Sequence, residues 1–258
     1  MYKCPMYKYS QESFKFSETP ALDYNLYCLY ADAIGDQKLP LIMVHGALVS
    51  RRYLMPTAEL LAGHLHVYVP DLAGHGGSTK VEHALSVEEQ ARVLHAWMIN
   101  SGFSKVNMLG HSNGSQIAGE FAAKHPEMIN KLVLASPAAD PNVTSLLEYF
   151  LRLVADGVLE NPLMPFVLLR DLWDMGIVRA FETAHQSMVY QLRDVLPRIK
   201  ARTLVIRGSR DFLVSQKWAE EIAATIADAR LDVVSDGPHN INFSTPEEFA
   251  PALLQFLE

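Results

Sequence analysis

Short apolar runs alternate with segments of helical periodicity along most of the chain. In residues 22–30 apolar side chains recur at every second position, which predicts a strand with one buried face. Runs such as 105–109 and 131–135 are apolar throughout, which is typical of parallel strands covered by helices on both faces. The pattern therefore predicts an α/β fold, with strands in 13–17, 22–30, 39–44, 65–69, 105–109, 131–135, 203–207 and 230–235.

Capping residues mark the starts of helices between these strands. Ser86, with a glutamate three residues later, predicts a capping box ahead of an apolar repeat at helical spacing. Thr245 and Glu248 predict a second capping box, with Pro246 at the first helical position. The segment 112–125 is expected to be a helix that ends before a proline.

One long stretch, between Pro137 and Ile199, has no strand signal and only helical patterns. It carries two apolar stripes at helical spacing, one within 146–154 and one within 169–181. An all-helical insertion between two strands is typical of a lid, although the alternative is that it only covers one edge of the core. The expected division is an α/β core of residues 1–137 and 200–258 and a helical cap of residues 138–199.

Charge and cysteine content exclude several other classes of protein. The chain has 258 residues with 22 basic and 29 acidic side chains, and its longest basic cluster is Arg51–Arg52, so a nucleic-acid partner is not expected. Two cysteines, Cys4 and Cys28, are too few for a disulfide framework or a four-thiolate zinc site. Because no signal peptide or apolar run of about 18–20 residues is present, we expect a soluble, cytoplasmic protein without a membrane span.

The strongest chemical motif is Gly110-His-Ser112-Asn-Gly114, which follows an apolar strand and opens a predicted helix. This is Gly-x-Ser-x-Gly in the strand–turn–helix setting that a nucleophile elbow requires. The turn lifts the serine hydroxyl above the sheet, and a Cβ at either glycine would collide with a neighbouring strand or helix. The positive end of the helix favours a developing anion. Ser112 is therefore the predicted nucleophile.

A serine hydroxyl needs an adjacent base and a group that orients this base. In this architecture the acid and then the histidine follow the serine along the chain. His239 lies in a turn after the last predicted strand and is the predicted base. Asp211 follows the preceding strand and is the predicted acid, which would hold the imidazole in the correct tautomer. Asp140, after the strand at 131–135, is the competing candidate for the acid.

Two main-chain N–H groups are expected to form an oxyanion hole. One belongs to Asn113, directly after the nucleophile, and the other to Ala47, with Leu48 as the second choice. His45 is expected to shape this loop rather than to act as a second base. The sequence has no metal, nucleotide or flavin motif, so we expect no cofactor and no metal site.

Six segments of the sequence share one order and spacing: His45-Gly46-Ala47, Pro70-Asp71-Leu-Ala-Gly74-His-Gly76-Gly-Ser78, Gly110-His-Ser112-Asn-Gly114, His125-Pro126-Glu127, Gly208-Ser-Arg-Asp211 and Gly237-Pro-His239. Taken together, these motifs resemble the α/β-hydrolase superfamily, of the serine esterase type, across nearly the whole chain. The resemblance implies an eight-stranded mostly parallel sheet with helices on both faces, a helical cap after the sixth strand, and a cofactor-free hydrolytic site beneath it. Asn113 departs from the usual pattern and puts a polar side chain near the expected acyl pocket, and Ser115 replaces a frequent glycine. Asp71, in the family's Asp-x-x-Gly-x-Gly-x-Ser segment, is expected to be structural.

We therefore expect a hydrolase that cleaves small or medium carboxylic esters through an acyl-enzyme, with Ser112, Asp211 and His239 as a catalytic triad. Leucine, phenylalanine and methionine in the cap favour a substrate with an apolar group. The same residues could serve a thioesterase, a lactonase, an amidase, a perhydrolase or a carbon–carbon bond hydrolase, because substrate choice depends on the cap. The alternative of another class is a hydrolase-like ligand receptor with little turnover. The expected assembly is a monomer or a homodimer.

Overall fold

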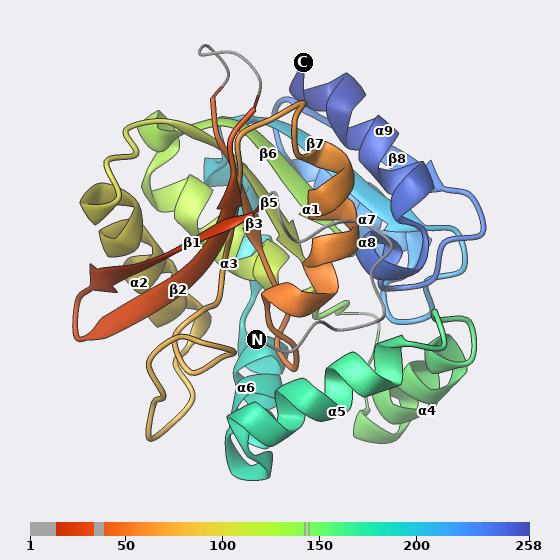
Figure 1. Cartoon of the computed structure of the whole chain (residues 1–258). Helices are drawn as coiled ribbons and strands as arrows, with labels where there is room; N and C mark the ends of the chain where they lie inside the picture. The colour runs from red at the N-terminus through yellow and green to blue at the C-terminus, as the bar shows by residue number, and fades with distance from the viewer. Residues whose placement is uncertain (1–13, 34–38, 142, 144) are drawn as a thin grey trace.

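The computed structural model describes residues 14–33, 39–141, 143 and 145–258. One eight-stranded sheet lies at its centre, with the strand order β1-β2-β4-β3-β5-β6-β7-β8 (Figure 1). The strand β2 pairs antiparallel with both of its neighbours, and all pairs from β4 to β8 are parallel. The predicted mostly parallel sheet is therefore confirmed. Its strands are β1 (Lys15–Ala21), β2 (Tyr24–Ala31), β3 (Leu41–Val44), β4 (Val67–Pro70), β5 (Val106–His111), β6 (Ile129–Ala135), β7 (Arg202–Gly208) and β8 (Ala229–Val234).

Every predicted strand overlaps an observed one, and the largest discrepancy is in β1. The prediction ended this strand at Ser17, whereas β1 continues through Pro20. An edge strand tolerates proline because one side of it has no partner strand, and within the described residues β1 pairs with β2 alone. Ser13, where the predicted strand began, and Cys4 lie outside the described residues.

Apolar side chains cover both faces of the sheet, as the uninterrupted apolar runs predict. In β6, Leu132 and Leu134 pack into one apolar cluster, whereas Val133 and Ala135 pack into the other. The helices α2, α3 and α7 contribute to the first cluster, and α1 and α9 contribute to the second. The core helices are α1 (Met55–Leu61), α2 (Val87–Asn100), α3 (Asn113–Lys124), α7 (Gln216–Thr225), α8 (Ile241–Ser244) and α9 (Pro246–Leu257).

Residues 138–199, here named the helical insertion, connect β6 to β7. No strand occurs among their described residues. The helices α4 (Leu146–Gly157), α5 (Met164–Met175) and α6 (Ile177–Val189) lie together beyond one end of the sheet, at the bottom of Figure 1. Four short 3-10 helices complete the secondary structure of the described ranges: η2 (Arg51–Leu54), η3 (Pro126–Met128), η4 (Leu192–Asp194) and η5 (Leu196–Arg198).

Several described side chains of the two apolar stripes are exposed. Trp173 is 85% exposed and Phe181 is 72% exposed in one stripe, and Leu147 is 68% exposed in the other. Across the ranges that the structure describes, every helix is too short or too polar to span a lipid bilayer.

Of the two predicted capping boxes, only the first is present. Ser86 Oγ accepts from the Glu89 N–H, and the Glu89 carboxylate accepts from the Ser86 N–H. At the start of α9, Pro246 occupies the first turn as predicted, but the Thr245 side chain makes no cap. The Thr245 hydroxyl donates instead to the Ile241 carbonyl oxygen of α8. Thr245 also ends α8, and its backbone angles of φ −135° and ψ 51° differ from the extended conformation that is typical of a capping residue.

Candidate active site

Ser112 lies in the sharp turn between β5 and α3. Its backbone dihedral angles are φ 56° and ψ −122°, which are unusual for a residue that carries a side chain. An added Cβ at Gly110 would lie 2.1 Å from the Gly114 carbonyl oxygen, and one at Gly114 would lie 2.2 Å from the Val44 carbonyl oxygen. Both distances are shorter than any tolerable contact, so the turn requires a glycine on each side of the serine. The backbone holds the Ser112 side chain at the carboxyl end of the central strands.

His239 reaches Ser112 from the turn after β8. Its Nε2 lies 3.1 Å from Ser112 Oγ, and its Nδ1 lies 3.1 Å from Asp211 Oδ2. An ionised carboxylate only accepts, so Nδ1 carries a hydrogen, and in the neutral imidazole Nε2 can accept from the serine hydroxyl. The structure therefore brings the three predicted triad residues together in the order hydroxyl, imidazole, carboxylate.

Burial and charge act in opposite directions on the imidazole and its carboxylate partner. Burial disfavours the ionised carboxylate, but His239 and the Val214 N–H outweigh it and hold the pKa of Asp211 below its usual range. Burial also disfavours the imidazolium, yet the carboxylates of Asp211, Asp156 and Glu160 outweigh it and raise the pKa of His239 to about 9. The neutral imidazole, which can act as a base, is therefore favoured by alkaline pH.

Asp140, the competing acid, has a different partner. Its Oδ2 accepts from the Ser215 N–H at 2.8 Å, at the start of α7. The loop after β6 directs Asp140 toward this helix, whereas the loop after β7 directs Asp211 toward His239. A contact across neighbouring parallel strands depends on the path of each loop, so the spacing of the two aspartates in the sequence could not distinguish them.

The predicted oxyanion donors lie on two sides of Ser112. Ala47 follows β3 and lines the same cavity as Ser112. The neighbouring N–H of Gly46 donates to a tyrosine hydroxyl at 2.8 Å, and the Ser112 N–H donates to a strand carbonyl oxygen at 2.9 Å, so both are engaged. Asn113 is the first residue of α3, where N–H groups have no partner within the helix. Ala47 and Asn113 therefore stay the predicted donors.

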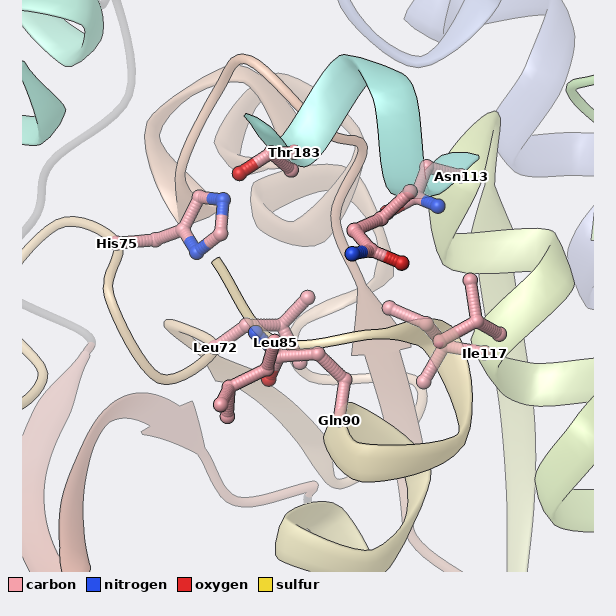
Figure 2. Close-up of a pocket in the computed structure, with 9 residues that line it drawn as sticks. Leu72, His75, Leu85, Gln90, Asn113, Ile117 and Thr183 are labelled. Atoms are coloured by element: carbon pink, nitrogen blue, oxygen red, sulfur yellow. The ribbon is translucent and has the colours of Figure 1, made fainter. Parts of the chain in front are cut away.

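The side chain of Asn113 corrects one expectation, because it is absent from the lining of the cavity that contains Ser112. Its Nδ2 donates to Gln116 Oε1 at 2.7 Å, and the side chain lines a separate small pocket with His75 and Thr183 (Figure 2). Ser112 lies in the turn before α3, whereas Asn113 is the first residue of α3. The side chains of these two adjacent residues therefore point in different directions. The polar amide therefore does not act on the expected acyl pocket.

A chain of buried hydrogen bonds joins the loop after β3 to the turn that holds His239. The Tyr53 hydroxyl accepts from the Gly46 N–H and lies 2.9 Å from His111 Nδ1, while His111 Nε2 lies 2.9 Å from the His239 carbonyl oxygen. A carbonyl oxygen only accepts, so His111 Nε2 carries the hydrogen and the Tyr53 hydroxyl donates to Nδ1. Burial lowers the pKa of His111 to about 3, which keeps this imidazole neutral. His111 is the variable residue of the elbow motif, and no sequence pattern indicates Tyr53.

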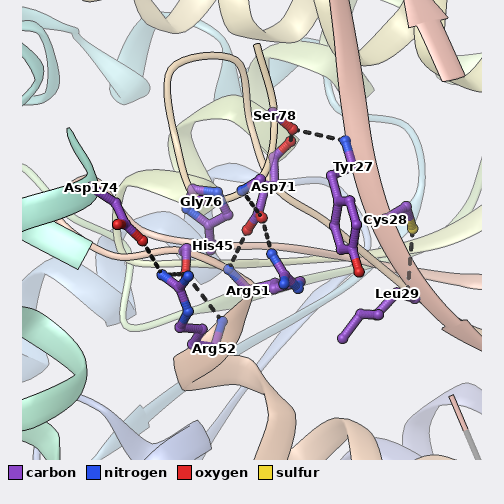
Figure 3. A network of polar contacts seen from close by, with 12 residues as sticks. Tyr27, Cys28, Leu29, His45, Arg51, Arg52, Asp71, Gly76, Ser78 and Asp174 are labelled. Atoms are coloured by element: carbon purple, nitrogen blue, oxygen red, sulfur yellow. Dashed lines mark hydrogen bonds and ion pairs between the residues drawn. The ribbon is translucent and has the colours of Figure 1, made fainter. Parts of the chain in front are cut away.

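Asp71 has the structural role expected from the sequence (Figure 3). Its carboxylate accepts from the N–H groups of Arg51 and Gly77, both at 2.8 Å, and forms an ion pair with the Arg51 side chain. A Cβ at Gly76 would lie 2.1 Å from the Asp71 carboxylate, which explains this glycine of the motif. His45 also shapes the region, because its Nε2 accepts from the Leu72 N–H at 2.9 Å. Together these contacts fasten the loop after β4 to the loop after β3.

A cavity of about 240 Å³ lies over Ser112 and His239. Core loops form one side of it, and the helices α4 and α5 of the insertion form the other. Most of the side chains that the insertion contributes are apolar, including Leu153, Met164 and Leu168. The cavity can therefore hold a small molecule with an apolar portion next to the serine hydroxyl.

Two carboxyl groups of the insertion, those of Asp156 and Glu160, also line this cavity and contact the turn that holds His239. The sequence analysis did not single them out. Their only signal is a spacing of four residues across the end of a helix, which is common on any helix surface. Their contacts depend on how the insertion lies on the core, which no local pattern reports.

Comparisons with known proteins agree with this architecture. A family model described as "alpha/beta hydrolase fold" matches residues 40–167. The human monoacylglycerol lipase ABHD6 is 23% identical over 254 residues, covering 85% of this chain and 75% of that protein. A poly(3-hydroxyalkanoate) depolymerase from Ectopseudomonas oleovorans is 24% identical over 239 residues, covering 85% of this chain and 84% of that protein.

Solved structures resemble the fold over nearly the full chain. A membrane phospholipase A described as a bacterial virulence factor has a TM-score of 0.82 at 21% identity, covering 95% of this chain and 86% of the other. The enol-lactonase from Burkholderia xenovorans has a TM-score of 0.77 at 21% identity, covering 93% of this chain and 99% of the other. The strand order, the serine turn after β5 and these similarities lead to one conclusion: the chain belongs to the α/β-hydrolase superfamily.

Proposed function

We propose that the protein is a serine hydrolase that cleaves small or medium carboxylic esters with an apolar group. The observation that carries this proposal is the hydrogen-bonded series of Ser112 Oγ, the His239 imidazole and the buried Asp211 carboxylate, with 3.1 Å at each of the two contacts. Cleavage of an ester bond is consistent with the names of a relative called a monoacylglycerol lipase and of another called a poly(3-hydroxyalkanoate) depolymerase.

In the first half of the reaction, Ser112 Oγ attacks the ester carbonyl carbon while His239 Nε2 takes the hydroxyl proton. Asp211 stabilises the resulting imidazolium. The N–H groups of Ala47 and Asn113 would donate to the oxyanion, and each such donor is typically worth about 2.7–4 kcal/mol in the transition state. The alcohol then leaves with the proton from His239 and the acyl group stays on Ser112.

In the second half, water attacks the acyl carbon and gives a proton to His239. The tetrahedral intermediate collapses, the bond from the carbonyl carbon to Ser112 Oγ breaks, and His239 returns its proton to the serine. The free acid departs and the starting state is restored. Both halves use the same base and the same oxyanion donors.

We also propose that the helical insertion acts as a cap over the site. Leu153 from α4 and Met164 from α5 contribute to the wall of the cavity that contains Ser112. An apolar wall stabilises an apolar acyl or alcohol group by removing it from water. The substrate range would therefore depend on the cap, while the chemistry depends on the core.

The test is hydrolysis of short p-nitrophenyl esters by the wild type and by Ser112→Ala. We expect turnover by the wild type and a kcat reduced by on the order of 10⁴-fold or more in the variant. Labelling of Ser112 by a fluorophosphonate reports the activated hydroxyl independently of substrate choice. No turnover together with no labelling would contradict the proposal and favour the ligand receptor.

A further inference from the structure

The end of α4 and the turn after it carry two carboxyl groups beside the site. Asp156 is the penultimate residue of α4 and is 2% exposed, and Glu160 lies four residues later. Both residues line the cavity that contains Ser112. Buried carboxylates are costly unless they are well bonded, so their partners show what they do.

Asp156 holds the main chain of both loops that supply the imidazole and its acid. Its Oδ1 accepts from the His239 N–H at 3.0 Å and from the Phe212 N–H at 3.3 Å. Phe212 directly follows Asp211 in the sequence. One carboxylate oxygen of the insertion therefore joins the turn after β8 to the loop after β7.

Glu160 holds the next residue of the same turn. Its Oε1 accepts from the main-chain N–H and the side-chain Nδ2 of Asn240, both at 2.8 Å, and Oε2 accepts from the Ser244 hydroxyl of α8. Glu160 therefore connects the insertion both to the turn that holds His239 and to α8.

The carboxyl pair is also a source of negative charge next to the imidazole. Burial and the adjacent Asp156 raise the pKa of Glu160 to about 7. The other titratable groups that face the pair are the His239 imidazole, with Asp211 behind it, and the Tyr53 phenol. Negative charge on the pair favours the protonated imidazole, so its removal would lower the pKa of His239.

We propose that Asp156 and Glu160 are positioning residues for the reaction, which fix the main chain of the His239 turn and of the Asp211 loop and set the charge that the imidazole experiences. This inference rests on the proposed ester hydrolysis. It makes the helical insertion part of the catalytic geometry and not only a wall of the substrate cavity.

The first experiment separates charge from geometry with the isosteric double variant Asp156→Asn/Glu160→Gln. Both amides can still hydrogen-bond to the same loops, but neither carries charge. We expect the midpoint of the kcat/KM profile against pH to fall by about one unit, with KM near that of the wild type. A purely structural role would leave the midpoint where it is.

The second experiment removes the anchor itself with Asp156→Ala. Displacement of the imidazole by about 1 Å costs on the order of 100-fold, so we expect kcat to fall by about 10–100-fold with a smaller change in KM. The matched control is Glu182→Ala, because Glu182 also lies in the insertion and accepts from a core N–H, that of Ala84, at 2.8 Å, but contacts neither catalytic loop. We expect the control to keep the wild-type kcat.

An unchanged midpoint in the double variant, or equal kcat values for Asp156→Ala and Glu182→Ala, would overturn the proposal. If Asp156→Ala does not fold, the midpoint of the pH profile of the isosteric double variant still tests the proposal. If the wild type does not hydrolyse esters, the proposed function fails, and the imidazole NMR titration of His239 still tests the pair. A lower pKa of His239 in the double variant supports the inference, and the same pKa in both proteins rejects it.

Discussion

The sheet core buries most of its large apolar side chains, whereas the helical insertion leaves several of its own exposed. In the core, Trp97 is 1% exposed and Leu132 is fully buried. In the insertion, Trp173 is 85% exposed and Val158 is 81% exposed. Burial of apolar surface is the main favourable term in the free energy of folding. The buried side chains of the core therefore stabilise the fold, whereas these exposed side chains of the insertion contribute little.

The insertion contacts the core through buried apolar side chains, such as Met164 and Val167, and also through directional polar contacts. Asp171 on α5 accepts from the main-chain N–H and the hydroxyl of Ser50, at 2.7 and 2.9 Å, and forms an ion pair with Arg52. This contact lies in the loop after β3, while Asp156 contacts the turn of His239. Hydrogen bonds define positions more sharply than apolar area does, and these bonds end on the loops that surround Ser112. The comparison teaches that the exposed apolar side chains of the insertion add little stability, whereas its polar contacts place the loops around Ser112.

The largest expected effect belongs to the core. Asp211→Asn should lower kcat by about 10⁴-fold, because an amide at this position favours the wrong tautomer of His239. Asp140→Asn is the control and should stay close to the wild type, since its carboxylate contacts the start of α7. Steady-state kinetics on a p-nitrophenyl ester measures both. Loss of activity in Asp140→Asn alone would move the acid to the loop after β6.

Removal of a buried core ring should have the next largest effect. Trp97→Ala is expected to lower the free energy of unfolding by about 3–5 kcal/mol, because it removes a large apolar side chain and leaves a cavity. Urea denaturation followed by circular dichroism measures the change. A loss below about 1 kcal/mol would show that α2 does not depend on this side chain.

The pH dependence of activity reports both regions, because carboxylates from the core and from the insertion raise the pKa of His239 to about 9. A protonated imidazole cannot accept the serine proton, so kcat/KM should rise with pH and level off above this value. At pH 7, about two units below this pKa, kcat/KM should be about 100-fold lower than its plateau, because it falls tenfold for each pH unit. Ser112→Ala corrects for alkaline hydrolysis of the ester. A plateau that already begins at pH 7 would contradict the expectation.

The smallest expected effect belongs to the surface of the insertion. Trp173→Ala should change the free energy of unfolding by less than about 0.5 kcal/mol, because the indole is already in water. The same urea experiment as for Trp97→Ala gives a direct comparison of two tryptophans. A loss comparable to that of Trp97→Ala would mean that the Trp173 indole, too, is stabilised by apolar burial.

Local patterns predicted most of the fold and the chemical groups of the site. The apolar runs located each strand, and the Gly-x-Ser-x-Gly motif placed Ser112 in its turn, since both depend on neighbours within a few residues. The second capping box is absent because Thr245 directly ends α8, a helix that the sequence pattern did not indicate, and its backbone lacks the extended conformation of a capping residue. A local rule holds only while the neighbouring structure leaves the backbone free to adopt the required conformation.

The sequence by itself determined the sheet, the strained turn and the residue types available for a triad, because backbone sterics and apolar periodicity act over short distances along the chain. Only the tertiary structure decided that Asp211 and not Asp140 contacts His239, that the Asn113 side chain leaves the cavity, and that Asp156 reaches the His239 N–H. The last of these contacts joins residues 83 positions apart. Such contacts depend on strand order and on how the insertion lies on the core, and these are properties of the packed molecule rather than of any segment of it.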